Sequence, residues 1–353
     1  MTTSPPAQTG ASPAGDALAG LAAQDLRRLV ARIERAPLYA HAYAFHLNMR
    51  FGGFTPADLA RFAAAQGLAG LKIHVEDGEA AALLRMDAAA RRRFRTLCEE
   101  LGLRVDVETS STAVPVLAEA IDVARDVGAD MVRCYPRYAG PVSSILRRVV
   151  ADLRQLRVLD PAGRLLFALE QHEDLRSEEL VAILREVADP HLSLLFDFGN
   201  MINAYETPER ALGVMAAHVT DVHVKDVVVV EDRGGWGHRA CRSGEGEIDF
   251  HGLLARLLLL GDEVPQVRAI ALEEENGLFC PAYRFPGEAQ DPVIPERGPS
   301  LTELSAEVDL PARLAAERAD ADRQVLHVRG VLAELKAAAL GRLSLSSPSR
   351  SSA

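Results

Sequence analysis

Short runs of β-branched and other apolar residues alternate along the chain with longer stretches whose apolar residues recur at helical spacing. The short runs predict eight strands, at residues 39–47, 68–75, 103–108, 129–135, 164–170, 192–197, 219–224 and 267–273. Some of the longer stretches begin with a capping residue followed by proline, as in Thr55-Pro56 and Thr207-Pro208, which is typical of helix N-termini. The chain is therefore predicted to alternate between strands and helices eight times.

This alternation determines the predicted fold class. Strands joined through helices pair in parallel by right-handed crossovers. A spacing of roughly 25 to 35 residues between strands, in a chain of 353 residues, favours a closed eight-stranded barrel. The main alternative is an open doubly wound sheet, which usually carries a glycine-rich turn after its first strand. Only Gly52-Gly53 stands at that point, so we predict an α/β fold with a (β/α)8 TIM barrel.

The barrel is predicted to make up most of a single domain. Residues 1–17 and 342–353 are poor in apolar side chains and rich in small and polar ones, so disordered tails are expected at both ends. Residues 18–341 form the predicted domain, in which a helical extension precedes a barrel proper at about 37–341.

Two long segments break the regular spacing of strands. Residues 227–250 follow the seventh predicted strand, and residues 277–309 follow the eighth. Long loops inside a compact domain are commonly functional, and both segments would lie at the C-terminal face, where TIM barrels keep their active sites. A final helix is predicted at roughly 311–341.

Composition and charge narrow the class of partner. The formal net charge of −11 argues against nucleic acid, whose binding relies on a basic surface. No segment has the roughly eighteen uninterrupted apolar residues that span a bilayer, so no membrane partner is expected. The four cysteines are far apart and form no CxxC pair, and reduced thiols in a cytoplasmic protein are the simplest interpretation. A small molecule is the expected partner.

Three carboxylates and one imidazole end four consecutive predicted strands. Glu170 and Glu273 each close the sequence ALE, Asp197 ends LLFD, and His223 lies in DVHV. Each has an ordinary explanation when taken alone, as a strand end in water, a helix cap or a core histidine. In a closed barrel the four converge, and three adjacent carboxylates cost several kcal/mol unless a cation neutralises them. Oxygen and nitrogen ligands suit Mn²⁺, Mg²⁺, Co²⁺ or Zn²⁺, so one divalent ion is predicted.

The same stretches resemble a known family. ALEQH, LLFDFGN, HVKD, SGEGEIDF and ALEEEN, in this order, are similar to the xylose-isomerase-like barrel superfamily of sugar isomerases and epimerases, over roughly residues 39–276. The resemblance implies that Glu170, Asp197, His223 and Glu273 bind one divalent ion. It also implies that Glu170 and Glu273 act as an acid/base pair on opposite sides of the substrate, and that the protein forms dimers or tetramers.

The chemistry of such enzymes explains this choice of residues. A proton next to a sugar carbonyl is very weakly acidic, so its removal requires stabilisation of the resulting enediolate. A divalent cation polarises the carbonyl, and carboxylates take up and return the proton. Six further residues are candidates for substrate binding: Arg133, His172, Asn200, Lys225, Trp236 and Glu245. Arg133 could instead form an ion pair with Glu108 or Glu170. His172 could instead hydrogen-bond a metal ligand and hold it in place.

The predicted function is therefore a metal-dependent sugar isomerase or epimerase. Asn200 stands where many epimerases carry a histidine, which favours the alternative of a lyase that decarboxylates or dehydrates an oxidised sugar acid. Arginines in the two long segments favour the same alternative, because an acid needs a cationic partner; they are Arg239, Arg242, Arg284 and Arg297. A non-catalytic sugar-binding barrel is a third interpretation. An apurinic endonuclease is disfavoured by Asn200 and by the net negative charge of the chain.

Overall fold

The computed structural model describes residues 12–297 and 309–345. Most of the two tails predicted to be disordered, residues 1–11 and 346–353, lies outside these ranges. Within the described part of the first tail, Pro13–Ala17 form a short helix, α1. The final helix, α12, runs from Leu310 to Leu345, slightly beyond its predicted bounds.

Eight parallel strands form a closed barrel in the order β1-β11-β8-β7-β6-β4-β3-β2. They are β1 (Leu38–His41), β2 (Gly70–His74), β3 (Arg104–Thr109), β4 (Met131–Cys134), β6 (Leu166–Glu170), β7 (Leu192–Asp197), β8 (Val219–Val224) and β11 (Ala269–Leu272). The first and last strands of the barrel close it, because Tyr39 pairs with Ala271 and Ala40 with Leu272. The predicted α/β TIM barrel is confirmed.

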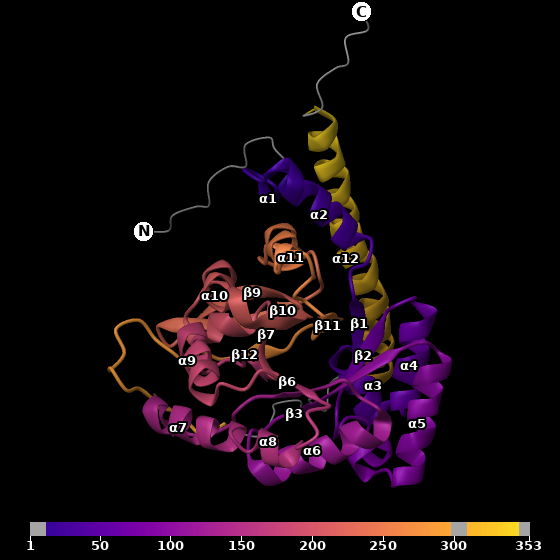
Figure 1. The fold of residues 1–353 in the computed structure, drawn as a ribbon, viewed down its shortest axis with the longest axis vertical. Helices are drawn as coiled ribbons and strands as arrows, with labels where there is room; N and C mark the ends of the chain where they lie inside the picture. The colour runs from indigo at the N-terminus through magenta and orange to yellow at the C-terminus, as the bar shows by residue number, and fades with distance from the viewer. Residues whose placement is uncertain (1–11, 298–308, 346–353) are drawn as a thin grey trace, which may run out of the picture. The chain divides into compact units, whose positions relative to one another are not determined.

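Helices follow the strands, as the alternating pattern predicted (Figure 1). They are α3 (His46–Phe51), α4 (Pro56–Ala65), α5 (Ala88–Glu100), α6 (Val114–Val127), α7 (Val142–Leu153), α8 (Leu156–Leu159), α9 (Ser177–Val187), α10 (Pro208–Met215) and α11 (Phe250–Leu259). Thr55 caps α4, since its hydroxyl accepts the Asp58 N–H while the Asp58 carboxylate accepts the Thr55 N–H. Thr207 caps α10 through the Arg210 N–H.

The chain divides into two compact units. The larger, residues 37–248 and 267–325, contains all eight barrel strands. The described part of the smaller is helical and includes α1, α2 (Ala23–Ile33), α11 and the C-terminal part of α12. Inside the smaller unit, the Arg32 guanidinium donates hydrogen bonds to the carbonyl oxygens of Leu258, Leu260 and Gly261 at 2.8 to 2.9 Å. These bonds tie the predicted helical extension to the end of α11.

The first strand is shorter than predicted. It ends at His41, and Ala42–Phe45 form a 3₁₀ turn that leads into α3, whereas the sequence predicted a strand as far as residue 47. The His41 imidazole accepts a hydrogen bond from the Tyr43 N–H at 3.0 Å and so caps this turn. An apolar run does not distinguish a strand from a buried turn, which explains the error.

The two long segments contain strands that were not predicted. Residues 226–241 form an antiparallel hairpin of β9 (Asp226–Asp232) and β10 (Gly235–Cys241). Its two-residue turn has φ angles of 53° at Arg233 and 83° at Gly234, as a type I′ turn requires. After the last barrel strand, β12 (Phe279–Cys280) pairs with β10, and β13 (Val293–Ile294) pairs with β5 (Gly140–Pro141).

A charged cluster occupies the barrel interior. Lys72 Nζ lies 2.9 Å from Asp221 Oδ1 and 3.3 Å from Asp106 Oδ2, and all three side chains are fully buried. A buried lysine requires such partners, since an unpaired charge in the interior is very costly. Among the described residues no helix is both long and apolar enough to cross a membrane.

Candidate metal and active site

The four side chains predicted to bind the ion meet at the C-terminal ends of their strands. Glu170 ends β6, Asp197 ends β7, His223 is the penultimate residue of β8, and Glu273 follows β11. His223 Nδ1 lies 3.4 Å from Glu170 Oε1, 3.9 Å from Asp197 Oδ2 and 3.3 Å from Glu273 Oε2. All four are buried. The register explains the meeting, because Asp197 pairs with His223 across β7 and β8.

Each of the four side chains has an atom without a hydrogen bond to the described residues. These atoms are Glu170 Oε2, Asp197 Oδ2, His223 Nδ1 and Glu273 Oε2. The three oxygens do have cationic neighbours, since Arg133 lies 3.0 Å from that of Glu170 and Lys225 lies 3.2 and 3.0 Å from those of Asp197 and Glu273. The other oxygen of Asp197 is satisfied, since Oδ1 accepts the N–H groups of Gly199 and Asn200 at 2.7 and 2.9 Å. Three carboxylate oxygens with one imidazole nitrogen form a donor set that suits a divalent cation.

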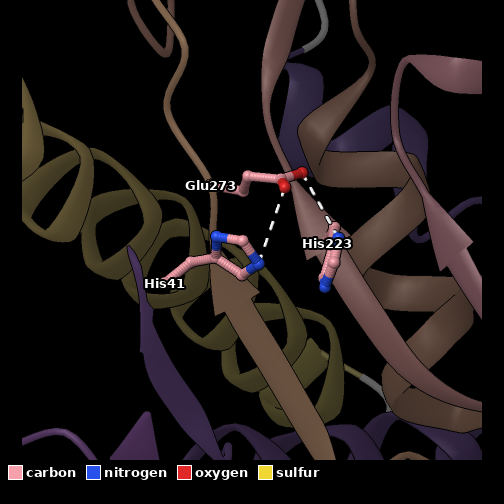
Figure 2. A group of neighbouring side chains, drawn as sticks. All are labelled: His41, His223 and Glu273. Carbon is pink, nitrogen blue, oxygen red and sulfur yellow. Dashed lines mark ion pairs between the residues drawn. The ribbon is translucent and has the colours of Figure 1, made fainter. Parts of the chain in front are cut away.

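His41 lies beside this cluster. Its Nε2 is 3.5 Å from Glu273 Oε1. Figure 2 shows the Glu273 carboxylate in contact with both imidazoles, those of His41 and His223. His41, His223 and Glu273 are close enough to hold an ion themselves. However, His41 Nδ1 accepts the Tyr43 N–H, so the proton of the neutral ring is on Nε2. His41 Nε2 therefore donates to Glu108 Oε2 at 3.0 Å and has no lone pair for an ion, so the group of Glu170, Asp197 and His223 is the better ion site.

Lys225 contacts two of the predicted ligands directly. Its Nζ lies 3.2 Å from Asp197 Oδ2, 3.0 Å from Glu273 Oε2 and 3.4 Å from Glu275 Oε2. Burial opposes the charge on Lys225, but Asp197, Glu273 and Glu275 together raise its pKa well above the usual value. The lysine is therefore a buried cation within the carboxylate cluster.

Arg133 lies on the other side of the cluster and has both of the partners considered from the sequence. Its Nε is 3.0 Å from Glu170 Oε2, and its terminal nitrogen is 2.9 Å from Glu108 Oε2. Glu108 was not predicted as a site residue, yet it is fully buried and also contacts His41 and His223. A signal for it was present, because Glu108 ends its predicted strand as Glu170 and Glu273 end theirs.

Asn200 and His172 complete the candidate site. Asn200 Nδ2 donates to Glu170 Oε1 at 3.3 Å, and its Oδ1 accepts from Lys225 Nζ at 3.5 Å. The His172 ring stacks on Tyr135 with centroids 3.7 Å apart. Burial, with the nearby charge of Arg297, holds the pKa of His172 well below its usual range, so the ring is neutral.

Trp236 and Glu245 are not brought to the metal ligands. Trp236 contacts Tyr205, with ring centroids 4.2 Å apart and planes tilted by 31°, and packs against an apolar cluster that includes Ile202 and Val227. The side chain of Glu245 is exposed. Both are on the hairpin segment, which folds as a sheet of its own with β12.

The arginines of the two long segments are already engaged. Arg242 Nε lies 2.7 Å from Asp320, and Arg284 lies 2.8 Å from Glu179 and 2.7 Å from Glu288. Arg297 pairs with Glu173 and, at 3.0 Å, with Asp174. The Arg239 guanidinium lies over the Phe279 ring at 5.5 Å. Three of these arginines are thus paired with carboxylates, whereas Arg239 is exposed and contacts an aromatic ring.

The chain is similar in sequence and fold to known barrel proteins. Residues 60–264 match the family model of the xylose isomerase-like TIM barrel. The uncharacterized protein YihM of Escherichia coli K12 is 46% identical over 310 residues, 88% of this chain and 95% of that protein. 3-Oxo-isoapionate decarboxylase of Pectobacterium atrosepticum is 23% identical over 181 residues, 49% of this chain and 63% of that protein. A solved L-ribulose 3-epimerase matches with a TM-score of 0.56 at 14% identity, covers 89% of this chain and 99% of its own, and so shares the fold.

Proposed function

Because the chain belongs to the xylose isomerase-like TIM barrel family, we propose that it is a divalent-metal-dependent isomerase or epimerase of sugars. The observation that carries the proposal is the convergence of three buried carboxylates on one imidazole, because oxygens of Glu170, Asp197 and Glu273 all lie 3.3 to 3.9 Å from His223 Nδ1. The reaction is the transfer of a proton next to a carbonyl group. The fold shared with an L-ribulose 3-epimerase is consistent with this chemistry.

Glu170, Asp197, His223 and Glu273 would hold the ion, which when bound supplies the positive charge that stabilises an enediolate. Glu170 and Glu273 are the proposed acid and base, since they enter the cluster from non-adjacent strands, β6 and β11. One removes the proton next to the carbonyl, and the other returns a proton on the same or the opposite face. Lys225 sits between Asp197 and Glu273 and adds a fixed positive charge close to the developing oxyanion.

The pairing of the cations favours a neutral sugar as the substrate. Arg133 is held by Glu108 and Glu170, and Lys225 by three carboxylates. A substrate carboxylate would have to compete with these pairs, because a bidentate or charge-assisted partner is what an acid requires. The site as described therefore suits hydroxyl and carbonyl groups better than a second anion.

A decarboxylase acting on an oxidised sugar acid is the second candidate. Its support is the similarity to 3-oxo-isoapionate decarboxylase, which extends over half of this chain. Such an enzyme would use the same four ligands, because loss of CO₂ from a 3-oxo acid also passes through an enolate. A decarboxylase differs from an epimerase because it needs a cationic side chain that binds the substrate carboxylate before CO₂ is lost.

The experiment that tests the proposal is proton exchange in D₂O. Protein stripped with EDTA is reloaded with Mn²⁺, Mg²⁺, Co²⁺ or Zn²⁺ and incubated with a panel of ketoses and aldoses, and NMR follows deuterium at the carbon next to the carbonyl. Glu170→Gln and Glu273→Gln should abolish exchange. The matched control is Glu274→Gln, because Glu274 is equally buried but bonds Ser243. Exchange that persists undiminished after metal removal would refute the metal mechanism.

The second candidate is separated by its product. Incubation of the reloaded protein with 3-oxo sugar acids, with CO₂ measured, gives gas release for a decarboxylase and none for an epimerase. Release of CO₂ together with no exchange in any neutral sugar would replace the first proposal by the second. We also propose that the protein is cytoplasmic and forms a homodimer or homotetramer. Light scattering of the purified protein tests the oligomeric state.

A further inference from the structure

Glu108 is a buried charge that contacts the predicted ligand His223 and two neighbours of the other ligands, His41 and Arg133. It lies in β3, in register with His74 of β2 and with Arg133 of β4. Its side chain is fully buried, and both oxygens are in use. Oε1 is 3.0 Å from His223 Nε2, and Oε2 is 3.0 Å from His41 Nε2 and 2.9 Å from Arg133. The role of this carboxylate goes beyond balancing one arginine.

The partners of Glu108 determine the direction of its hydrogen bonds. Arg133 is an ion-pair partner of Glu108 at 2.9 Å, and a permanent cation at this distance favours the ionised carboxylate. His41 Nδ1 already accepts the Tyr43 N–H, so His41 Nε2 carries the proton and also donates to Glu108. An ionised carboxylate can only accept, so Glu108 is an acceptor toward His223 as well. His223 Nε2 therefore carries a proton, and in the neutral ring that binds a metal the lone pair is on Nδ1.

His223 Nδ1 is the atom that faces the other ligands. It lies 3.3 to 3.9 Å from oxygens of Glu170, Asp197 and Glu273 and forms no hydrogen bond with the described residues. A lone pair that points at three carboxylates is unfavourable unless a cation lies between them. We propose that Glu108 is a positioning residue of the metal centre, which selects the His223 tautomer whose Nδ1 binds the ion. The proposal rests on the proposed function, in which His223 is a ligand.

Glu108 also supports two further ligands through shared partners. His41 Nε2 lies between Glu108 and Glu273, at 3.0 and 3.5 Å. Arg133 bridges Glu108 and Glu170 at 2.9 and 3.0 Å. Three of the four ligands are thus held, directly or through one neighbour, by a single carboxylate. Asp197 is the exception, because main-chain N–H groups hold it.

The test is a titration of the metal-free full-length protein with Mn²⁺ alone. The EPR signal of free Mn²⁺ measures how much of the ion is bound. Glu108→Gln places an amide that donates where the site needs an acceptor, so we expect a roughly 10- to 100-fold higher dissociation constant. Asp106→Asn is the matched control. Asp106 is two residues earlier on β3 and equally buried, but it pairs with Lys72. This control should bind Mn²⁺ as the wild type does.

A second measurement uses only protein with Glu108 in place. NMR of ¹⁵N-histidine-labelled protein loaded with Zn²⁺, with the His223 signal identified by its loss in His223→Gln, reports the protonated nitrogen. The expected result is a proton on Nε2 and a metal-bound Nδ1. A proton on Nδ1, or wild-type Mn²⁺ affinity in a folded Glu108→Gln, overturns the role of Glu108. Wild-type protein that binds no Mn²⁺ instead overturns the proposed function, and the inference falls with it.

Discussion

Lys225 Nζ lies 3.0 Å from Glu273 Oε2, the same oxygen that faces His223 Nδ1 at 3.3 Å. An ammonium group and a metal ion would therefore share one carboxylate. Lys225 compensates the negative charge of Asp197 and Glu273 in the metal-free protein. It also opposes the approach of a second cation, because like charges repel strongly in a buried site.

Lys225→Met is expected to destabilise the metal-free protein and to strengthen metal binding. Loss of one partner from a buried ion pair costs roughly 3–5 kcal/mol, and saturating Mn²⁺ should restore most of that loss. Thermal unfolding with and without Mn²⁺ measures both effects. Lys336→Met is the control, because Lys336 pairs with Glu34 at the surface and should contribute little. Equal melting of metal-free Lys225→Met and wild type would contradict the expectation.

Asn200→Ala is expected to lower turnover and to leave metal affinity almost unchanged. The substitution removes the amide that donates to Glu170 Oε1 at 3.3 Å. It keeps the main-chain N–H that caps Asp197 Oδ1 at 2.9 Å. A hydrogen bond to a charged group is worth about 1.5–3 kcal/mol, so kcat should fall roughly tenfold or more. Steady-state kinetics and a Mn²⁺ titration test this, and a large loss of affinity would show that the side chain itself supports the ion.

The buried cluster of Lys72, Asp106 and Asp221 makes stability depend on pH. Burial raises the pKa of Asp106 to about 6, with a further contribution from Asp221 and opposition from Lys72. In the unfolded chain the pKa of an aspartate is about 3.9. The folded protein therefore binds more protons between these values. The contribution of Asp106 to stability is complete below about pH 4 and is lost as the pH rises through 6.

Asp106→Asn should remove this dependence. Relative to the wild type, the free energy of unfolding of the variant should rise between pH 4 and 7, by roughly 3 kcal/mol for a shift of two pKa units. Lys72 keeps Asp221 as a partner at 2.9 Å. Urea unfolding at several pH values gives the comparison. A difference between the two proteins that stays constant with pH would show that Asp106 does not titrate in this range.

Gly70 allows a close approach of strands at the start of β2. A Cβ atom at this position would lie 2.5 Å from the Arg104 carbonyl oxygen and 2.6 Å from the Tyr39 ring. Gly70→Ala should therefore destabilise the protein by roughly 1–3 kcal/mol through overpacking. Gly330→Ala is the opposite case, because nothing lies within 4 Å of its Cβ position in α12. It should stabilise by about 0.5–1 kcal/mol. Denaturant midpoints of both variants test the contrast.

The barrel was predictable because its pattern is redundant. Eight separate apolar runs had to be strands, and the structure places a strand within or overlapping each of them. The error at residues 42–47 arose where Ala, Tyr and Phe suit both a strand and a buried turn. The hairpin of β9 and β10 was missed, although a run of valines followed by Arg233-Gly234 carries its signal. Its turn requires positive φ at both positions, and arginine rarely indicates that conformation.

The candidate site shows a different limit. Glu170 and Glu273 end strands with the same local sequence. Their proximity could be predicted because the C-terminal ends of barrel strands converge. The same reasoning reached Glu108 only as a partner for Arg133. What could not be read from the sequence is the orientation of polar side chains around them. The contacts of Lys225 and His41 depend on side-chain rotamers, and Trp236 lies against Tyr205 because the hairpin residues Val227 and Ala240 pack on Ile202.

The seam of the barrel has a consequence for synthesis of the protein. β1 pairs with β11, so the first barrel strand to be translated can complete its pairing only after the last barrel strand has been translated. His41 and Glu273 lie on either side of this seam. Until residue 273 has left the ribosome, a nascent chain has two open sheet edges and lacks one of the three carboxylates of the predicted ligand set. Completion of the cluster therefore coincides with closure of the sheet, and a chain that stops short of Glu273 has neither.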